Sequence, residues 1–541
     1  MFAGMLRWID VNILALAREL RLSYLPPLMV YIAFGISGLT SIVGTFFVKD
    51  YLGLSASVLA ALAFWAGIPF VLKMPIGHLV DLIWRWKSWL VFLGAGLIAA
   101  SLLIMAGLLT DRPAMTAVMS AEAWFVFSTL LAPVGYVIQD VVADAMTVEA
   151  VPRVDERGHP VDQAARKLMN TTMQTLGRVA VIGGLALVAA INLYVFADAE
   201  RLSEAEKVAA YRRVYLTALF IPLISVAGIV LAHFLSLRQL QRLVAQGVDR
   251  RKARELLSVQ DERPAPDWWI LGGSAVFVAF TLGMGFSRIA FNQEIVFAGS
   301  LAIVAFLIAK LARELEPEAR ATLIGTAAVV FVYRAIPNPG DGLTWWMIDE
   351  LKFDQRFLAV LDLIAGILTL VGMFLFRRFM AVRSIAYVVG FLTIVGTVLS
   401  LPIIGLYYGL QDWTMAMTGG VVDARNIVIV NTALASPLGQ IAMIPMLAWI
   451  ANSAPRNLKA TYFAVMASFS NLALSAGQLG TKYLNQAYVV EREVKDPATG
   501  VVKVAADYGQ LGELLIVAII LGLLLPFAAI LAARALGLKW A

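Results

Sequence analysis

Two acidic residues lie inside an otherwise apolar stretch, YVIQDVVADAMTVE at residues 136–149. Asp140 and Asp144 are four residues apart and share one face of a helix, whereas Glu149 falls about 180° away from Asp140 at roughly 3.6 residues per turn. A charged side chain at the centre of a bilayer costs about 2.5–3.5 kcal/mol unless it is paired or hydrated. Neighbouring carboxylates do not lose their protons together, so such a pair can take up and release one proton. We therefore predict a proton-coupling pair at Asp140 and Asp144, with Glu149 at the cytoplasmic mouth.

Arg178 lies at a matching depth in the next apolar stretch. A helix rises about 1.5 Å per residue, which places Asp140 roughly 13 Å from Glu149 and Arg178 roughly 17 Å from Lys167 on the following, antiparallel segment. We therefore expect Asp140 and Arg178 to meet near the middle of the membrane. Two interpretations are open: a structural ion pair that ties the two helices together, or a group that couples protons or gates substrate.

The segment VYRAIPNPGDGLTWW at residues 332–346 places prolines and glycines between and around Arg334 and Asp341. Such residues break a membrane helix and free backbone groups, which is tolerated only where protein or water satisfies them. This pattern predicts a broken helix beside a substrate cavity. The alternative is a packing kink with an arginine that extends to the membrane surface.

The segment GHLVDLIWRWK at residues 77–87 carries Gly77, Asp81 and Arg85 at intervals of four. This spacing is typical of the major facilitator superfamily, in which the loop latches the cytoplasmic gate. We assign the motif, with Lys73 just before it and with Glu149, to such a gate. The Lys73 ammonium is alternatively expected to snorkel to the membrane surface.

The composition indicates the surroundings of these residues. Of 541 residues, 60% are hydrophobic and 15% charged, with a mean hydropathy of +0.80, which exceeds that of ordinary globular domains. The net charge of +6 comes from short basic clusters between apolar runs, a pattern that sets membrane topology and does not indicate nucleic-acid binding. Because there is no cysteine and the three histidines are scattered, we expect no thiolate chemistry, metal site or cofactor.

About fourteen segments are apolar and long enough to cross a bilayer, which takes about 20 residues. Lys and Arg collect in alternate loops, which predicts that both termini are cytoplasmic, in what we expect to be a bacterial inner membrane. The predicted spans are 26–48, 57–75, 88–109, 116–148, 167–196, 213–236, 268–287, 290–311, 322–349, 356–376, 385–408, 426–451, 459–484 and 511–535.

An internal repeat predicts how the spans are grouped. FVKDYLGLSASVLAAL at 47–62 aligns with WMIDELKFDQRFLAVL at 346–361, and VPR at 151–153 corresponds to APR at 454–456. The two matches imply two six-helix halves related by a parallel repeat. The expected parts are an amphipathic helix at 1–25, a first half at 26–236, a basic cytoplasmic linker with an inserted helix pair at 237–318, and a second half at 319–541 with an external loop at 485–510. Around DPATG at 496–500 we expect a small hairpin.

Several motifs together resemble the folate-biopterin transporter family of the major facilitator superfamily. They lie in both halves and cover most of the chain except the N-terminal helix, residues 237–318 and the hairpin. The most specific is QDVVADA, which begins at residue 139; the others are FFVKDYLGLS (46–55), IPFVLKMPIGHLVD (68–81), YRAIPNPGDG (333–342), DELKF (349–353) and GQIAMIPMLAWIANSAPRNLKATYFAVMASFSNLALS (439–475). The resemblance implies an all-α fold of two six-helix halves and uptake of pteridine or folate-like compounds, coupled to protons, by alternating access.

The resemblance also bears on single residues. It places Asp140 and Asp144 at the family's paired acids, Lys73 at its basic position before the inner-loop motif, and Arg178 at its arginine in the fifth span. Three positions depart from the pattern, because Arg334 replaces a neutral polar residue and Asn431 and Lys459 stand near expected acids. The added positive charge suits an anionic ligand without specifying folate.

We therefore expect a monomeric secondary transporter of a small organic anion in the lipid bilayer, with protons as its coupling ion and no nucleic acid as a partner. Substrate binding is assigned to Arg178, Arg334, Asp341 and Gln139, and no residue is assigned a catalytic role. The alternatives are a membrane sensor or scaffold that does not transport and a polytopic lipid-modifying enzyme. The sequence disfavours an enzyme or an ATP-driven pump, because it has no phosphate-binding glycine-rich loop, metal-ligand cluster or Ser-His-Asp set.

Overall fold

The computed structural model describes residues 18–52, 54–71, 73–152, 161–197, 203–257, 268–287, 289–313, 316–376, 379, 383–439, 441, 459–495 and 502–540. Apart from turns, loops and two short strands, these residues are helical, which confirms the predicted all-α class. Eight of the described helical stretches are long and apolar enough to cross a membrane, and three shorter apolar helices accompany them. Some predicted spans, such as 426–451, include residues outside the described ranges.

The first group of helices covers residues 22–245. Its elements are η2 (Leu22–Tyr24), α3 (Leu25–Gly35), η3 (Ile36–Thr40), α4 (Ser41–Tyr51), α5 (Ala56–Val71), α6 (Lys73–Leu82), η4 (Trp84–Trp86), α7 (Lys87–Thr110), α8 (Arg112–Val118), α9 (Ala121–Ala150), α10 (Gln163–Val195), α11 (Glu204–Ala218) and α12 (Phe220–Ala245). We call these the N-terminal group. The predicted span 116–148 is divided between two helices. Helix α8 ends at Val118, and Ser120 caps the start of α9 by accepting a hydrogen bond from the Ala123 amide. Helix α12 also continues past residue 236, where the linker was expected to begin.

The remaining elements begin with α13 (Arg250–Leu257) and a helix pair, α14 (Trp268–Phe286) and α15 (Asn292–Ala312). The C-terminal group follows: α16 (Pro317–Arg334), α17 (Asp341–Asp349), α18 (Gln355–Leu375), α20 (Ile385–Tyr407), α21 (Leu410–Thr418), α22 (Ala424–Ala435), η6 (Ser436–Leu438), α24 (Lys459–Ala487), β1 (Val494–Lys495), β2 (Val502–Val504) and α25 (Leu511–Ala535). Strands β1 and β2 pair antiparallel, which confirms the predicted hairpin, although its turn lies outside the described residues.

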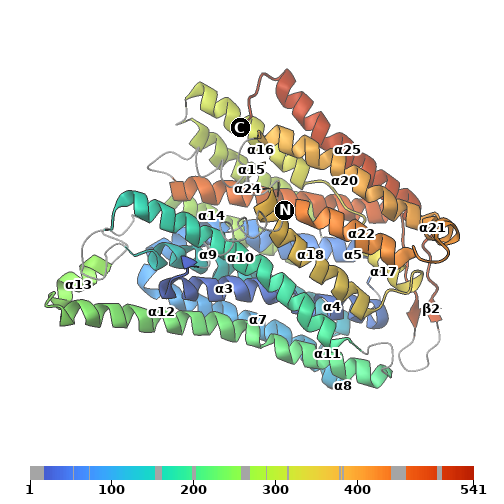
Figure 1. Ribbon diagram of the computed structural model, residues 1–541, viewed down its shortest axis with the longest axis horizontal. Coiled ribbons are helices and arrows are strands. Elements are labelled where there is room, and N and C mark those ends of the chain that lie inside the picture. The colour runs from blue at the N-terminus through green and yellow to red at the C-terminus, as the bar shows by residue number, and fades with distance from the viewer. Residues whose placement is uncertain are drawn as a thin grey trace, which may run out of the picture.

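Each group packs mainly on itself, and two long seams join them (Figure 1). Helix α5 lies along α24, and α10 lies along α18. In the second seam Gly366 allows the close approach, since a Cβ at that position would lie 2.9 Å from the Cα of Ala186. The pair α14–α15 bridges both groups, because Gln293 donates to the Ala61 carbonyl of α5 and Glu294 pairs with Lys482 of α24.

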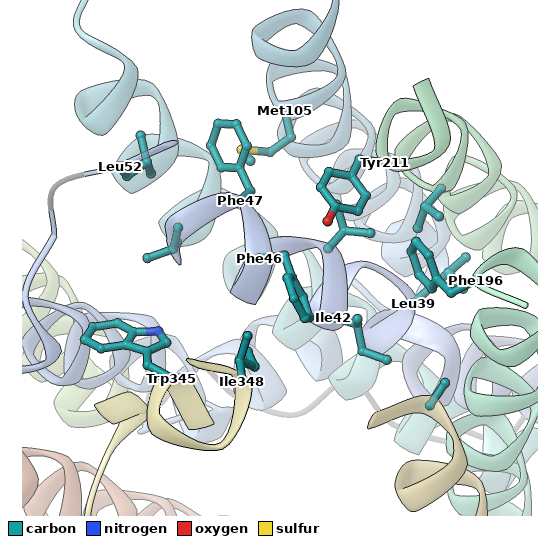
Figure 2. Close-up of a cluster of buried hydrophobic side chains, with 14 of the residues drawn as sticks. Leu39, Ile42, Phe46, Phe47, Leu52, Met105, Phe196, Tyr211, Trp345 and Ile348 are labelled. Carbon is teal, nitrogen blue, oxygen red and sulfur yellow. The ribbon is translucent and has the colours of Figure 1, made fainter. Parts of the chain in front are cut away.

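The two groups also meet at the end of the molecule that carries β1, β2, α8 and α21, opposite α13 (Figure 1), which we call the hairpin end. One continuous hydrophobic cluster fills it, and Figure 2 shows Phe46 and Phe47 of α4 in the same cluster as Trp345 and Ile348 of α17. This end of the molecule is therefore closed by apolar packing between the groups.

Polar contacts reinforce the closure at the hairpin end. Arg492, buried beside β1, donates to the Val48 carbonyl of α4 and stacks over the Trp345 ring with a separation of 4.9 Å. Tyr508 donates to Asp349 at 2.5 Å, and burial together with that hydrogen bond raises the pKa of Tyr508 above its usual value. The phenol therefore stays protonated, and keeps donating, at neutral pH.

Helices α7 and α9 make the most extensive helix contact in the N-terminal group. A Cβ at Gly94 would lie 2.6 Å from the Gly135 carbonyl oxygen, and about two turns of helix farther on the Ser101 and Ser128 hydroxyls donate to each other's backbone carbonyls. Small residues of this kind let helix backbones approach within a membrane. Gly96, on the same helix, has no atom within 4 Å of the position where a Cβ would stand.

Replacing Gly94 with valine should therefore destabilise the protein by about 1–3 kcal/mol, because the added methyl groups force α7 and α9 apart. Thermal unfolding of the detergent-solubilised protein measures the effect. Gly96→Val is the matched control and should leave the melting temperature unchanged. Equal losses in the two variants would show that helix propensity, and not the α7–α9 contact, sets the cost.

Candidate functional site

Three helices of the N-terminal group bring their polar side chains together around Lys73. Its Nζ atom lies 2.7 Å from Oδ2 of Asp140 and 2.7 Å from Oδ2 of Asp144. Tyr31 of α3 donates to Oδ1 of Asp144 at 2.6 Å. One ammonium group thus bridges two carboxylates, and a phenol supports the second of them.

The backbone explains this convergence. Asp140 and Asp144 follow each other by one turn of α9, so both point toward α6, and Lys73 is the first residue of α6. The exposed fractions of the Lys73, Asp140 and Asp144 side chains are 20%, 18% and 42%, so the second acid is the more accessible to solvent. The two carboxylates therefore share one partner but have different surroundings.

Lys73, and not Arg178 as expected, is the direct ion-pair partner of Asp140. Arg178 of α10 is within electrostatic reach of Asp140, but its guanidinium forms no ion pair with any carboxylate in the described part of the chain. The expectation that Asp140 and Arg178 form a direct pair was wrong, as was the alternative that Lys73 snorkels to the surface. The reason is that the Lys73 ammonium lies 2.7 Å from both carboxylates and so occupies the position where a direct partner of Asp140 would stand.

Glu149 has a separate partner. Its carboxylate lies 2.5 Å from Nζ of Lys87, a buried lysine whose ammonium also stands 4.1 Å from the centre of the Trp84 ring. Gly77, from the predicted gate motif, faces Val141 of α9. The side chains of Asp81 and Arg85 lie outside the described ones, so the gate remains a prediction.

Gln139 does not have the environment of a substrate ligand. It is buried, its Nε2 donates to the Val91 carbonyl of α7, and its Oε1 accepts from Ser225 of α12. A position next to Asp140 turns the side chain about 100° away on the helix, toward these neighbours. In this conformation it serves as a packing contact among three helices, and its assignment to substrate binding stays a prediction.

The predicted helix break is present in the C-terminal group. Helix α16 ends at Arg334 and α17 begins at Asp341, after Gly340 with φ of +77°. Helix α24 supports the intervening backbone: Asn485 donates to the Pro339 carbonyl at 3.0 Å, and Thr481 accepts from the Asn338 amide at 3.0 Å. Protein groups therefore satisfy part of what the break exposes.

Glycines on α24 make room for that backbone. A Cβ at Gly477 would lie 3.2 Å from the Ile336 carbonyl oxygen, and one at Gly480 would lie 2.9 Å from the Pro337 ring. These two glycines leave room for the backbone of the break, and Thr481 and Asn485, which follow them on α24, hydrogen-bond to it. This pattern on α24 was not recognised in the sequence, although its small residues are a signal of close helix contact.

A cavity of about 850 Å³ adjoins the break. Its wall includes Arg334 and comes from α16, α17, α20, α22, α24 and α25. Nε of Arg334 donates to the Ser470 carbonyl at 3.3 Å, and the Arg334 charge is within electrostatic reach of Arg178 in the other group. Asp341 flanks the break at the start of α17 and is not itself among the residues of this wall, so its role in substrate binding stays a prediction.

Comparison with known proteins identifies the class of molecule. A profile of the BT1 family matches residues 197–537. A folate-biopterin transporter from Synechocystis sp. is 22% identical over 465 residues, which cover 84% of this chain and 74% of that protein. A putative folate transporter 2 from Plasmodium berghei is 27% identical over 167 residues, or 30% of this chain and 34% of its own length.

Solved structures of transporters share the fold. A POT family transporter in complex with 5-aminolevulinic acid superposes with a TM-score of 0.59 at 12% identity and covers 95% of this chain and 96% of its own. The nucleoside transporter NupG gives a TM-score of 0.51 at 12% identity and covers 95% of this chain and 100% of its own. The fold is that of the major facilitator superfamily, and the protein is an integral, multi-pass membrane transporter and not an enzyme. Because the BT1 profile matches more than half of its residues, the chain belongs to the BT1 family.

Proposed function

We propose that the protein moves a folate-like or pteridine-like organic anion across the membrane together with protons, by alternating access. The names of the curated relatives support the substrate class. The observation that carries the coupling is the single Lys73 ammonium shared by Asp140 and Asp144. Two acids that compete for one cation differ in proton affinity, so one of them can exchange a proton during a cycle.

The charges explain why an anion and a proton would travel together. Lys73 and Arg178 balance Asp140 and Asp144, while Arg334 of the C-terminal group adds one positive charge. When either acid is protonated, one of the cations that balanced it also becomes uncompensated, so the site then carries two excess positive charges, including that of Arg334. An anion that binds Arg178 or Arg334 then offsets the charge that the proton brings, so each ligand strengthens the binding of the other.

The two arginines also supply a reason for the groups to close only around substrate. Arg178 and Arg334 belong to different groups and repel each other. An anion between them would replace that repulsion by attraction. In the proposed cycle, therefore, bound substrate favours approach of the two groups at mid-membrane.

We infer from the basic residues which end of the molecule faces the cytoplasm. Helix α13 carries Arg250, Arg251, Lys252 and Arg254 at the end opposite the hairpin, which suits the cytoplasm. The hairpin end would then face outside, and its apolar cluster closes the outer entrance in this conformation. Outward opening would require α17 to separate from α4.

Replacing Asp140 with asparagine should abolish proton-driven accumulation of folate while leaving exchange of internal for external folate largely intact. A gradient of one pH unit supplies about 1.4 kcal/mol per proton, enough for about tenfold accumulation, and the variant should reach only equal concentrations. Uptake into proteoliposomes with and without an imposed pH gradient measures both activities. Asp362→Asn, on α18 and outside the Lys73 cluster, is the control and should accumulate normally.

The control also identifies the failure of the proposal. Accumulation that persists in Asp140→Asn and in Asp144→Asn, or that is lost in Asp362→Asn alone, would remove the coupling role from the Lys73 cluster. Folate binding by the wild-type protein would then still support the substrate class.

Replacing Lys73 with methionine should destabilise the protein by up to about 3 kcal/mol, because two neighbouring carboxylates lose their shared cation. Adding Asp144→Asn to this variant should recover most of the stability, since Arg178 then balances the one remaining acid. Thermal unfolding of the purified single and double variants tests the charge balance. If the double variant is less stable than Lys73→Met alone, packing and not charge determines the loss.

A further inference from the structure

Two residues that line the cavity beside the helix break each carry a buried polar atom that lacks a partner. Oγ1 of Thr393, on α20, and Oδ1 of Asn431, on α22, form no hydrogen bond with any part of the chain that the structure describes. Both residues line the cavity. Buried polar groups are nearly always hydrogen-bonded, and those without a partner often mark a place that a ligand or water completes.

A neighbouring side chain on the same wall behaves differently. Thr397 lies one turn after Thr393 on α20, and its hydroxyl donates to the Thr393 carbonyl at 2.8 Å within the helix. A threonine in this helix can thus satisfy itself without a ligand. Among the described residues of this wall, the buried side-chain atoms that lack a partner are the Thr393 hydroxyl and the Asn431 amide oxygen.

The rest of the wall indicates the shape and charge of what would fit. Most of it is apolar, with Ile336, Leu343 and Ile519 among its residues. At its border, Arg334 uses Nε for the Ser470 carbonyl, and no other hydrogen bond of its guanidinium is found among the described residues. The guanidinium geometry matches a carboxylate, and the volume of about 850 Å³ falls in the range of pockets for drug-sized ligands.

We propose that this cavity is a subsite for the heterocyclic end of the substrate. A flat ring fills the apolar part. The side chains of Asn431 and Thr393, whose oxygens are covered in this conformation, turn so that Oδ1 of Asn431 accepts from the ring N–H groups and the Thr393 hydroxyl meets the polar edge of the ring. The acidic end of the same molecule pairs with Arg334, on the side of Arg178. This inference rests on the proposed function and adds that the ring lies inside the C-terminal group, away from the Lys73 cluster.

Two probes separate the ends of the ligand. Folate carries both a pterin ring and carboxylates, whereas biopterin carries the ring without a carboxylate. The dissociation constant of each is measured on the purified full-length protein in lipid nanodiscs, for the wild type and for Asn431→Leu, Thr393→Val, Arg334→Met and Thr397→Val. The last is the matched control, since its hydroxyl is already satisfied within α20.

Asn431→Leu and Thr393→Val should each weaken both probes about five- to tenfold, because each removes a group that the ring engages. Arg334→Met should weaken folate at least tenfold and leave biopterin unchanged, and Thr397→Val should change neither. In the absence of ligand, Asn431→Leu and Thr393→Val should melt no lower than the wild type, because they remove a buried polar atom without a partner. That stability reading separates a lost contact from a misfolded protein.

Two results would overturn the subsite. If Asn431→Leu and Thr393→Val bind both probes like the wild type while Arg334→Met still weakens folate, the cavity holds only water or lipid and the proposed function stands. If Arg334→Met weakens biopterin as much as folate, the ring lies at the arginine instead. If the wild type binds neither probe, the proposed substrate class fails, whatever the variants do.

Discussion

The ammonium group of Lys73 compensates two carboxylates at once, and the surrounding N-terminal helices are arranged so that it can do so. In an apolar span each charge must find a partner, because water is not there to solvate it. The i, i+4 spacing of Asp140 and Asp144 on α9 lets a single cation reach both, and Tyr31 adds a hydrogen bond to the second. The helices α3, α6 and α9 are thus linked at one depth by polar contacts. Arg178, within electrostatic reach of Asp140, supplies the second positive charge without an ion pair among the described residues.

The same lack of water governs the backbone. The interruption between α16 and α17 frees amide and carbonyl groups, and α24 supplies Thr481 and Asn485 to meet them while Gly477 and Gly480 make the approach possible. The α24 helix also lies along α5 of the other group. A movement at the α5–α24 seam would therefore be felt directly at the helix break and at Arg334.

Much of this arrangement could be predicted from the sequence, and the misses have definite causes. Paired acids on one helical face and a break at the prolines near Arg334 follow from local periodicity and from proline chemistry. The role of Lys73 was missed because its depth was not counted: it lies nine residues before the end of α6 at Leu82, about 13 Å, which is close to the depth of Asp140 in α9. The contacts of Gln139 with α7 and α12 could not be predicted, because polarity alone does not say which neighbour a side chain faces.

The positions of the charges and of the apolar closure suggest how the two are connected. The hairpin end is held by nonpolar contacts between α4 and α17, and α17 begins where the helix break ends. Arg334 stands at the other side of the same break. An anion that bound Arg334 would therefore act on the short segment that leads to α17 and to the closure at the hairpin end. An apolar contact has no dependence on charge of its own, so in the proposed cycle the break is the element that converts an electrostatic change into a mechanical one.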